Sequence, residues 1–96
     1  MNRAILRLPA EHPCVEGHFS GNPIIPGAVL LDEILAAIER ARGQPAGAWV
    51  VKSVKFLQPV RPGDELAMEF TAASSGDIRF RCRIGALEVV TGLVRV

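Results

Sequence analysis

The 96-residue sequence has little of what several protein classes require. It contains no tyrosine, and its two cysteines, Cys14 and Cys82, form no Cys-x-x-Cys pair. A disulfide scaffold and a zinc site are therefore not expected, and such sparse cysteine is typical of a reducing cytosol. The formal net charge is only +1, from 11 basic and 10 acidic residues. This balance argues against binding nucleic acid through bulk charge.

Long apolar segments are also lacking. Arg3 and Arg7 interrupt the apolar N-terminal residues, and no run approaches the roughly 18–20 residues of a membrane-spanning helix. We therefore expect a cytoplasmic protein without a membrane span. Hydrophobic residues still make up 49% of the sequence and charged residues 22%, which is a globular composition. The length predicts one domain, residues 1–96, whose thin core a partner subunit would complete.

The first half of the chain predicts a short strand, a loop and a helix. Residues 3–8 alternate weakly between apolar and polar, as a strand does. Residues 9–26 contain four of the seven prolines and predict an ordered loop. Residues 28–42 carry an apolar stripe at helical spacing and end before Gly43. The stripe consists of Leu30, Leu31, Ile34, Leu35 and Ile38.

After the helix the hydrophobic period falls to two. The predicted strands are residues 48–58, 65–73, 78–84 and 87–96, with a hairpin turn at residues 74–77. In the first of these strands we expect Val50, Val54 and Phe56 to share one face. One helix followed by antiparallel strands predicts an α+β domain in which the sheet wraps the helix.

Two side chains could supply acid–base chemistry. His18 lies in the loop rich in proline and glycine, and Asp32 lies in the second turn of the predicted helix. At about 100° per residue, Asp32 falls roughly 60° beyond Leu35, at the edge of the apolar stripe. We expect partial desolvation there, which would raise the pKa of Asp32 and let it hold a proton near neutral pH. Glu33 is expected on a solvated face.

Each of these residues, taken singly, also has an ordinary structural explanation. A loop histidine is more often a surface or structural residue than a catalytic one. An aspartate near a helix start usually interacts with the helix dipole. Their combination with the surrounding sequence is what favours a functional role.

Residues 17–32, GHFSGNPIIPGAVLLD, resemble the signature of the 3-hydroxyacyl-acyl-carrier-protein dehydratases of fatty-acid synthesis. In that family a His-Phe pair precedes a Pro-x-x-Pro-Gly motif and a carboxylate in the helix. Residues 54–66, VKFLQPVRPGDEL, resemble the family's strand and Pro-Gly-Asp turn. Together the matches span residues 12–66 in the right order. The resemblance implies a hot-dog fold, in which an antiparallel sheet wraps a long helix, usually in a dimer.

The resemblance implies reversible dehydration of a (3R)-hydroxyacyl thioester, linked to acyl carrier protein or to CoA, to the trans-2-enoyl thioester. His18 would be the base that removes the C2 proton, and Asp32 would protonate or position the departing hydroxyl. The N–H of Gly27 would hold the thioester carbonyl, since a helix N-terminus offers unpaired N–H groups. Phe19 and Pro26 would lie beside the substrate. No metal or redox cofactor is expected.

The family resemblance also implies a dimer, because the histidine of one protomer meets the carboxylate of the other. Whether the partner is a second copy or a different hot-dog chain is open. The compact length and the sequence around His12-Pro13-Cys14 most resemble the short dehydratases of specialised pathways such as aryl polyene synthesis. We expect a structural role for His12 and burial of Cys14 as a small hydrophobe.

Two positions depart from the commoner family pattern. Ser20 stands where many members have proline, and no nucleophile-elbow motif surrounds it. Asp32 replaces the glutamate of the commoner branch, although aspartate occurs in the branch that also isomerises its product. Aspartate alone does not show isomerase activity. The acyl chain length also stays open, because the region before the histidine loop is short.

Three arginines, Arg79, Arg81 and Arg83, alternate along one predicted strand. If the hairpin turns about Ser75, Arg81 lies opposite Glu69, and a cross-strand ion pair on a solvated face is the favoured interpretation. The functional alternative is a docking patch for acyl carrier proteins, which are acidic.

Two other functions stay open. A hot-dog thioesterase could use the same helix N-terminus, with Asp32 activating water, although such enzymes generally lack the loop around His18. A non-catalytic acyl-binding subunit could instead pair with an active hot-dog partner. The presence of both His18 and Asp32 argues against this alternative, whereas the short chain argues for it.

Overall fold

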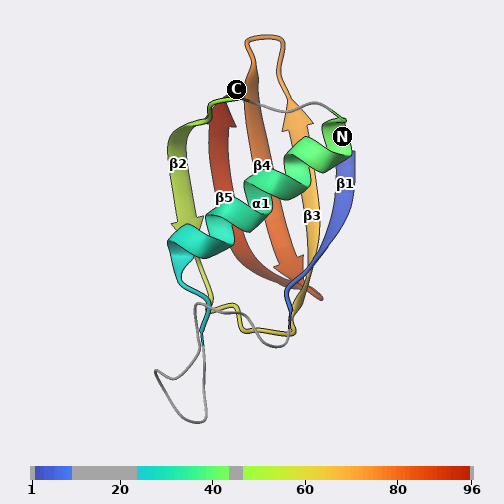
Figure 1. The fold of residues 1–96 in the computed structure, drawn as a ribbon, viewed down its shortest axis with the longest axis vertical. Coiled ribbons are helices and arrows are strands. Elements are labelled where there is room, and N and C mark those ends of the chain that lie inside the picture. Colours follow the sequence, from blue (N-terminus) through green and yellow to red (C-terminus); the bar gives the residue numbers. More distant parts are fainter. Residues whose placement is uncertain (1, 10–23, 44–46, 96) are drawn as a thin grey trace.

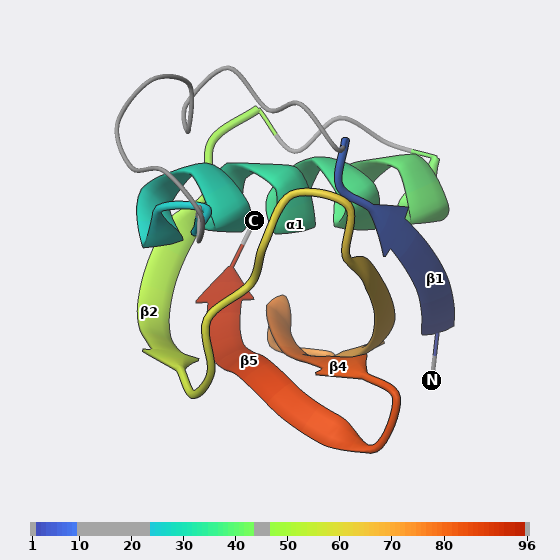
Figure 2. The ribbon, with the colours of Figure 1, turned by 90° about the horizontal axis from the view of Figure 1, so that it is seen from below.

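The computed structural model describes residues 2–9, 24–43 and 47–95, which contain one helix and five strands (Figure 1). In chain order they are β1 (Asn2–Arg7), α1 (Gly27–Arg42), β2 (Val50–Phe56), β3 (Glu65–Ala72), β4 (Asp77–Ile84) and β5 (Leu87–Arg95). The strands form one antiparallel sheet in the order β1-β3-β4-β5-β2. Figure 2 shows this sheet curling around α1, so the predicted α+β hot-dog architecture is confirmed.

The core lies between α1 and the inner face of the sheet. The helix buries Leu30, Ile34, Leu35, Ala37 and Ile38, which is the predicted stripe with Ala37 added and with Leu31 only half-buried. Strands β3 and β4 alternate as expected, because one side chain in two enters the core. Those buried side chains are Leu66, Met68, Phe70, Ile78, Phe80 and Cys82.

Strand β2 departs from the predicted alternation. A register shift in its pairing with β5 inserts Lys52 as an extra residue, which is a β-bulge. As a result Val50 lies opposite the exposed Arg95, whereas Val54 and Phe56 lie opposite the buried Gly92 and Val90. The prediction that the three apolar residues of this strand share one face is therefore wrong. A one-residue insertion is enough to move a side chain to the other face.

The two edge strands, β1 and β2, differ in what they expose. Several large apolar side chains on β2 and just after it are 45–56% exposed, namely Val50, Val51, Phe56 and Leu57. On β1 the exposed side chains include Arg3 and Arg7, with Ile5 as its one exposed large hydrophobic residue. No helix among the described residues is long and apolar enough to cross a membrane.

Candidate active site

The N-terminus of α1 presents backbone donors that the helix itself does not use. Pro26 is the N-cap and carries no N–H, and no side chain of the described residues caps this end. The N–H of Leu30 donates to the Pro26 carbonyl at 3.0 Å, which is the first bond of the helix. The N–H groups of Gly27, Ala28 and Val29 therefore have no acceptor within the helix. Together with the helix dipole, they form a positive end suited to a carbonyl oxygen that gains negative charge.

An apolar pocket of about 360 Å³ opens at this helix end. One wall is the segment 24–27 with Leu30, and the other wall is the segment 56–60. The two walls are joined where the N–H of Ile25 donates to the carbonyl of Val60 at 2.8 Å. Pro26 and Gly27 both line this pocket, whose apolar walls could receive an acyl chain.

Packing inside the chain also favours glycine at position 27. A Cβ at this position would lie 3.0 Å from both Cε2 and Cζ of the Phe56 ring, which is closer than ordinary contact. The neighbouring ring therefore favours glycine, which also leaves the backbone open to close approach. For Phe56 the prediction was only a place on one strand face, although its aromatic ring in the second matched segment was the available signal for a place beside Gly27.

Asp32 does not lie in this pocket. It is five residues after Gly27, so the two positions lie about 140° apart around the helix. Asp32 is exposed in the single chain, whereas Glu33 is half-buried and has an interaction partner. The expected partial desolvation of Asp32 and solvation of Glu33 are therefore wrong for the isolated protomer. A single protomer does not bring the carboxylate and the carbonyl-binding end together.

The remaining loop predictions lie outside the described residues. These are His18 and Phe19, together with Ser20, His12 and Cys14. Among the described ranges, no group of three or more His, Cys, Asp or Glu side chains could hold a metal ion. Cys82 is fully buried, and burial raises the pKa of its thiol to about 12. This thiol is protonated at neutral pH and is no nucleophile there.

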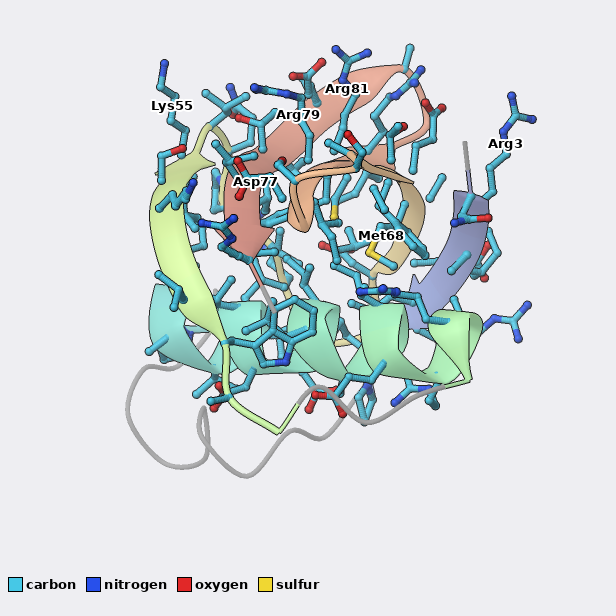
Figure 3. The ribbon with its side chains drawn as sticks, turned by 90° about the horizontal axis from the view of Figure 1, so that it is seen from above. Arg3, Lys55, Met68, Asp77, Arg79 and Arg81 are labelled. Atoms are coloured by element: carbon cyan, nitrogen blue, oxygen red, sulfur yellow. The ribbon has the colours of Figure 1, made fainter. Side chains whose placement is uncertain are left out.

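The three arginines of β4 have different surroundings. The predicted register is confirmed, because Arg81 lies opposite Glu69. The ion pair of Glu69 nevertheless runs diagonally to Arg83, with Nη2 to Oε1 at 2.6 Å, and Arg81 lies 3.5 Å from a carboxylate oxygen of Glu88. Arg79 has no ion pair among the described residues. Figure 3 shows Arg79 and Arg81 on the side of the sheet that faces away from α1.

A single antiparallel sheet wrapped around one helix defines a hot-dog protein, and solved structures agree. The chain superposes on the dehydratase heterocomplex ApeI:P from Xenorhabdus doucetiae with a TM-score of 0.74 and 22% identity, covering 97% of this chain and 83% of that one. It also superposes on the fluoroacetyl-CoA thioesterase FlK with a TM-score of 0.64 and 13% identity, covering 97% and 80%. At these identities the similarity establishes the fold alone.

The chain belongs to the ApeI-like dehydratase family, whose model, described as ApeI dehydratase, matches residues 2–92. Curated relatives are more distant. The 3-hydroxyacyl-[acyl-carrier-protein] dehydratase FabZ of Latilactobacillus sakei is 38% identical over 63 residues, which are 58% of this chain and 45% of that protein. FabZ of Yersinia enterocolitica is 33% identical over 89 residues, covering 81% and 53%. The chain thus spans about half the length of these relatives.

Proposed function

We propose that the chain catalyses the reversible dehydration of a (3R)-hydroxyacyl thioester, carried on acyl carrier protein, in fatty-acid or polyene-type chain synthesis. The observation that carries the proposal is the family match over residues 2–92. It is supported by the apolar pocket at the helix end, where a thioester carbonyl could meet the N–H of Gly27 while the acyl chain lies against the apolar walls.

The chemistry needs three groups. His18 takes the C2 proton as the general base, which leaves negative charge on the thioester oxygen. The N–H of Gly27 stabilises that oxygen, so this donor acts where charge develops. The electron pair then forms the C2–C3 double bond, and the C3 hydroxyl leaves as water with a proton from Asp32. In the reverse direction the same groups add water to the enoyl thioester.

The position of Asp32 supports an active site shared between two protomers. Within one chain its side chain points away from the pocket at Gly27, so the carboxylate that serves this pocket comes from a partner. Strand β2 offers the surface for such a partner, because its outer edge pairs with no described strand and exposes Val50 and Val51. Pairing would also give Asp32 the desolvation that the single chain does not provide.

The partner is a second copy or a related chain. A homodimer is the simpler arrangement, because β2 is self-complementary when two copies pair antiparallel about a twofold axis. A heterodimer is the second candidate, favoured by the similarity to a dehydratase heterocomplex. Mass measurement of the purified chain at micromolar concentration distinguishes them, since a chain that needs another partner stays monomeric.

A parallel assay of hydration and thiol release tests the activity. Purified protein is incubated with crotonyl and 3-hydroxybutyryl thioesters on acyl carrier protein while enoyl absorbance and free thiol are followed. We expect enoyl absorbance to fall with the crotonyl thioester and to rise with the 3-hydroxybutyryl thioester, without thiol release. The rate should fall about 10²–10⁴-fold for His18→Ala and for Asp32→Asn. Glu33→Gln is the matched control and should retain activity.

Other outcomes contradict the proposal in distinct ways. Thiol release that depends on Asp32 would move the assignment to a thioesterase. Full hydration activity in His18→Ala would remove that residue from the mechanism. A folded chain inactive on short, long and aromatic carrier-bound substrates, but active when a second hot-dog subunit is added, would make it a partner subunit.

A further inference from the structure

The outer face of the sheet, which faces away from α1, contains a second hollow. It has a volume of about 510 Å³ and crosses strands β3, β4, β5 and β2. The strand register places four of its side chains in one transverse row, in the order Glu69, Arg81, Thr91 and Lys55. Arg79 lies in the next row (Figure 3). We call this hollow the outer groove.

The outer groove has an excess of positive charge. Its charged lining residues are Lys55, Arg79, Arg81, Glu69 and Glu88. Both carboxylates are engaged by arginines, since Arg83 lies 2.6 Å from Glu69 and Arg81 lies 3.5 Å from Glu88. Two cations, Lys55 and Arg79, therefore have no ion-pair partner in the part of the chain that the structure describes.

Hydroxyl groups surround these two cations. Ser53, Thr71 and Thr91 line the same groove, and each can donate a hydrogen bond to an anionic oxygen. An ordinary solvated sheet face would carry scattered, mutually paired charges. Cations from two different strands, β2 and β4, instead line one hollow together with hydrogen-bond donors. This combination suits a carboxylate-rich or phosphate-bearing partner.

The outer groove also lies close to the proposed substrate pocket along the sheet. Lys55 lines the groove, and the next residue, Phe56, lines the pocket and faces Gly27. One residue along a strand is about 3.3 Å, with successive side chains on opposite faces. Lys55 and the pocket wall therefore lie one residue apart, on opposite faces of β2.

We propose that the outer groove is the docking surface for an acidic acyl carrier protein, contacted mainly through Lys55 and Arg79. This inference rests on the proposed function for the identity of the partner. The proposed contact residues differ from the predicted set of three arginines, because Arg83 forms an ion pair with Glu69 and Arg81 forms one with Glu88. Lys55 and Arg79 have no ion pair with another described residue that would have to break when a carboxylate approaches.

Charge reversal tests the docking surface. We would compare Lys55→Glu, Arg79→Glu and the double variant with wild type, using Arg42→Glu in the last turn of α1 as the matched control. The Kd for a bacterial holo acyl carrier protein is measured directly by fluorescence anisotropy, without turnover. We expect each reversal in the groove to raise the Kd about tenfold and Arg42→Glu to leave it unchanged. Raised ionic strength should weaken wild-type binding most.

Turnover gives the second readout. The same acyl group is offered on the carrier protein and on N-acetylcysteamine, a small thioester without a protein partner. The groove variants should raise the KM for the carrier-linked substrate about tenfold or more and leave the small substrate unaffected. Equal losses on both substrates, or a Kd that does not distinguish the groove variants from Arg42→Glu, would overturn the docking assignment.

The binding measurement separates this inference from the proposed reaction. Groove-dependent binding by a chain that dehydrates neither substrate would uphold the docking surface and reject the dehydratase. Dehydration of both substrates, with a carrier-protein Kd that does not change when Lys55 or Arg79 is reversed, would uphold the dehydratase and reject the docking surface. Circular dichroism of each variant checks that the fold is retained.

Discussion

The two edge strands of the sheet expose different kinds of side chain to solvent. At the β1 edge, Arg7 forms an exposed ion pair with Glu65 at 2.8 Å, and Arg3 adds a second charge. At the β2 edge, Val50 and Val51 are about half exposed, beside a bulge at Lys52. Charges on an edge strand discourage pairing with another strand, whereas exposed valines invite it. One sheet thus carries a protected edge and an edge suited to assembly.

Under the proposed function, this contrast explains why one protomer would hold only part of the proposed catalytic site. The helix N-terminus and its pocket are complete within one protomer, because residues 24–27 and 56–60 both belong to it. The carboxylate of Asp32 points elsewhere. A partner at the β2 edge would supply what the protomer lacks, and a partner at the β1 edge is disfavoured by the arginines.

The largest expected effect comes from placing a charge on the assembly edge. Val50→Glu should raise the dimer Kd at least about a hundredfold, because two copies would bring the carboxylates together at the interface. The protomer should still fold, since Arg95 lies opposite this position and can pair with the new carboxylate. Ile5→Glu, on β1, is the matched control. Analytical ultracentrifugation that finds both variants equally dimeric would refute the distinction between the edges.

The next effect concerns how β2 is held in place. Gly92 of β5 lies beside it in the sheet, and a Cβ there would be 2.5 Å from Cζ of Phe80 and 2.9 Å from the carbonyl oxygen of Ser53. Gly92→Ala should therefore lower the free energy of unfolding by about 2–3 kcal/mol, because the backbone of β2 must shift. Urea denaturation measures this change. Ala67→Val, exposed on the strand beside β1, should change it by less than about 0.5 kcal/mol.

The smallest effect compares one ion pair at each edge. Lys52 reaches from the bulge to Asp77, with Nζ 3.0 Å from Oδ1 and 3.1 Å from Oδ2, and these side chains are 38% and 24% exposed. Lys52→Met should cost about 1 kcal/mol of unfolding free energy. Arg7→Met breaks a pair whose side chains are 79% and 55% exposed and should cost less than about 0.5 kcal/mol. Equal costs would mean that burial does not distinguish these pairs.

Much of the fold could be predicted because it depends on local pattern. The apolar stripe of residues 28–42 and the period of two in β3 and β4 fix which side chains enter the core, and both were right to within a few residues. The Glu69–Arg81 register followed from the position of the hairpin turn. The motif in residues 17–32 led to the family, which the match over residues 2–92 confirmed.

Other features depend on contacts between residues distant in sequence. The bulge at Lys52 reverses the face of Val50, and no alternation of apolar and polar residues encodes it. The choice of Arg83 as the partner of Glu69 depends on side-chain reach across the sheet. The ring of Phe56 against Gly27 depends on how β2 meets the helix. Periodicity thus determined which residues face the core, whereas tertiary packing decided which neighbours they meet and which charges stay unpaired.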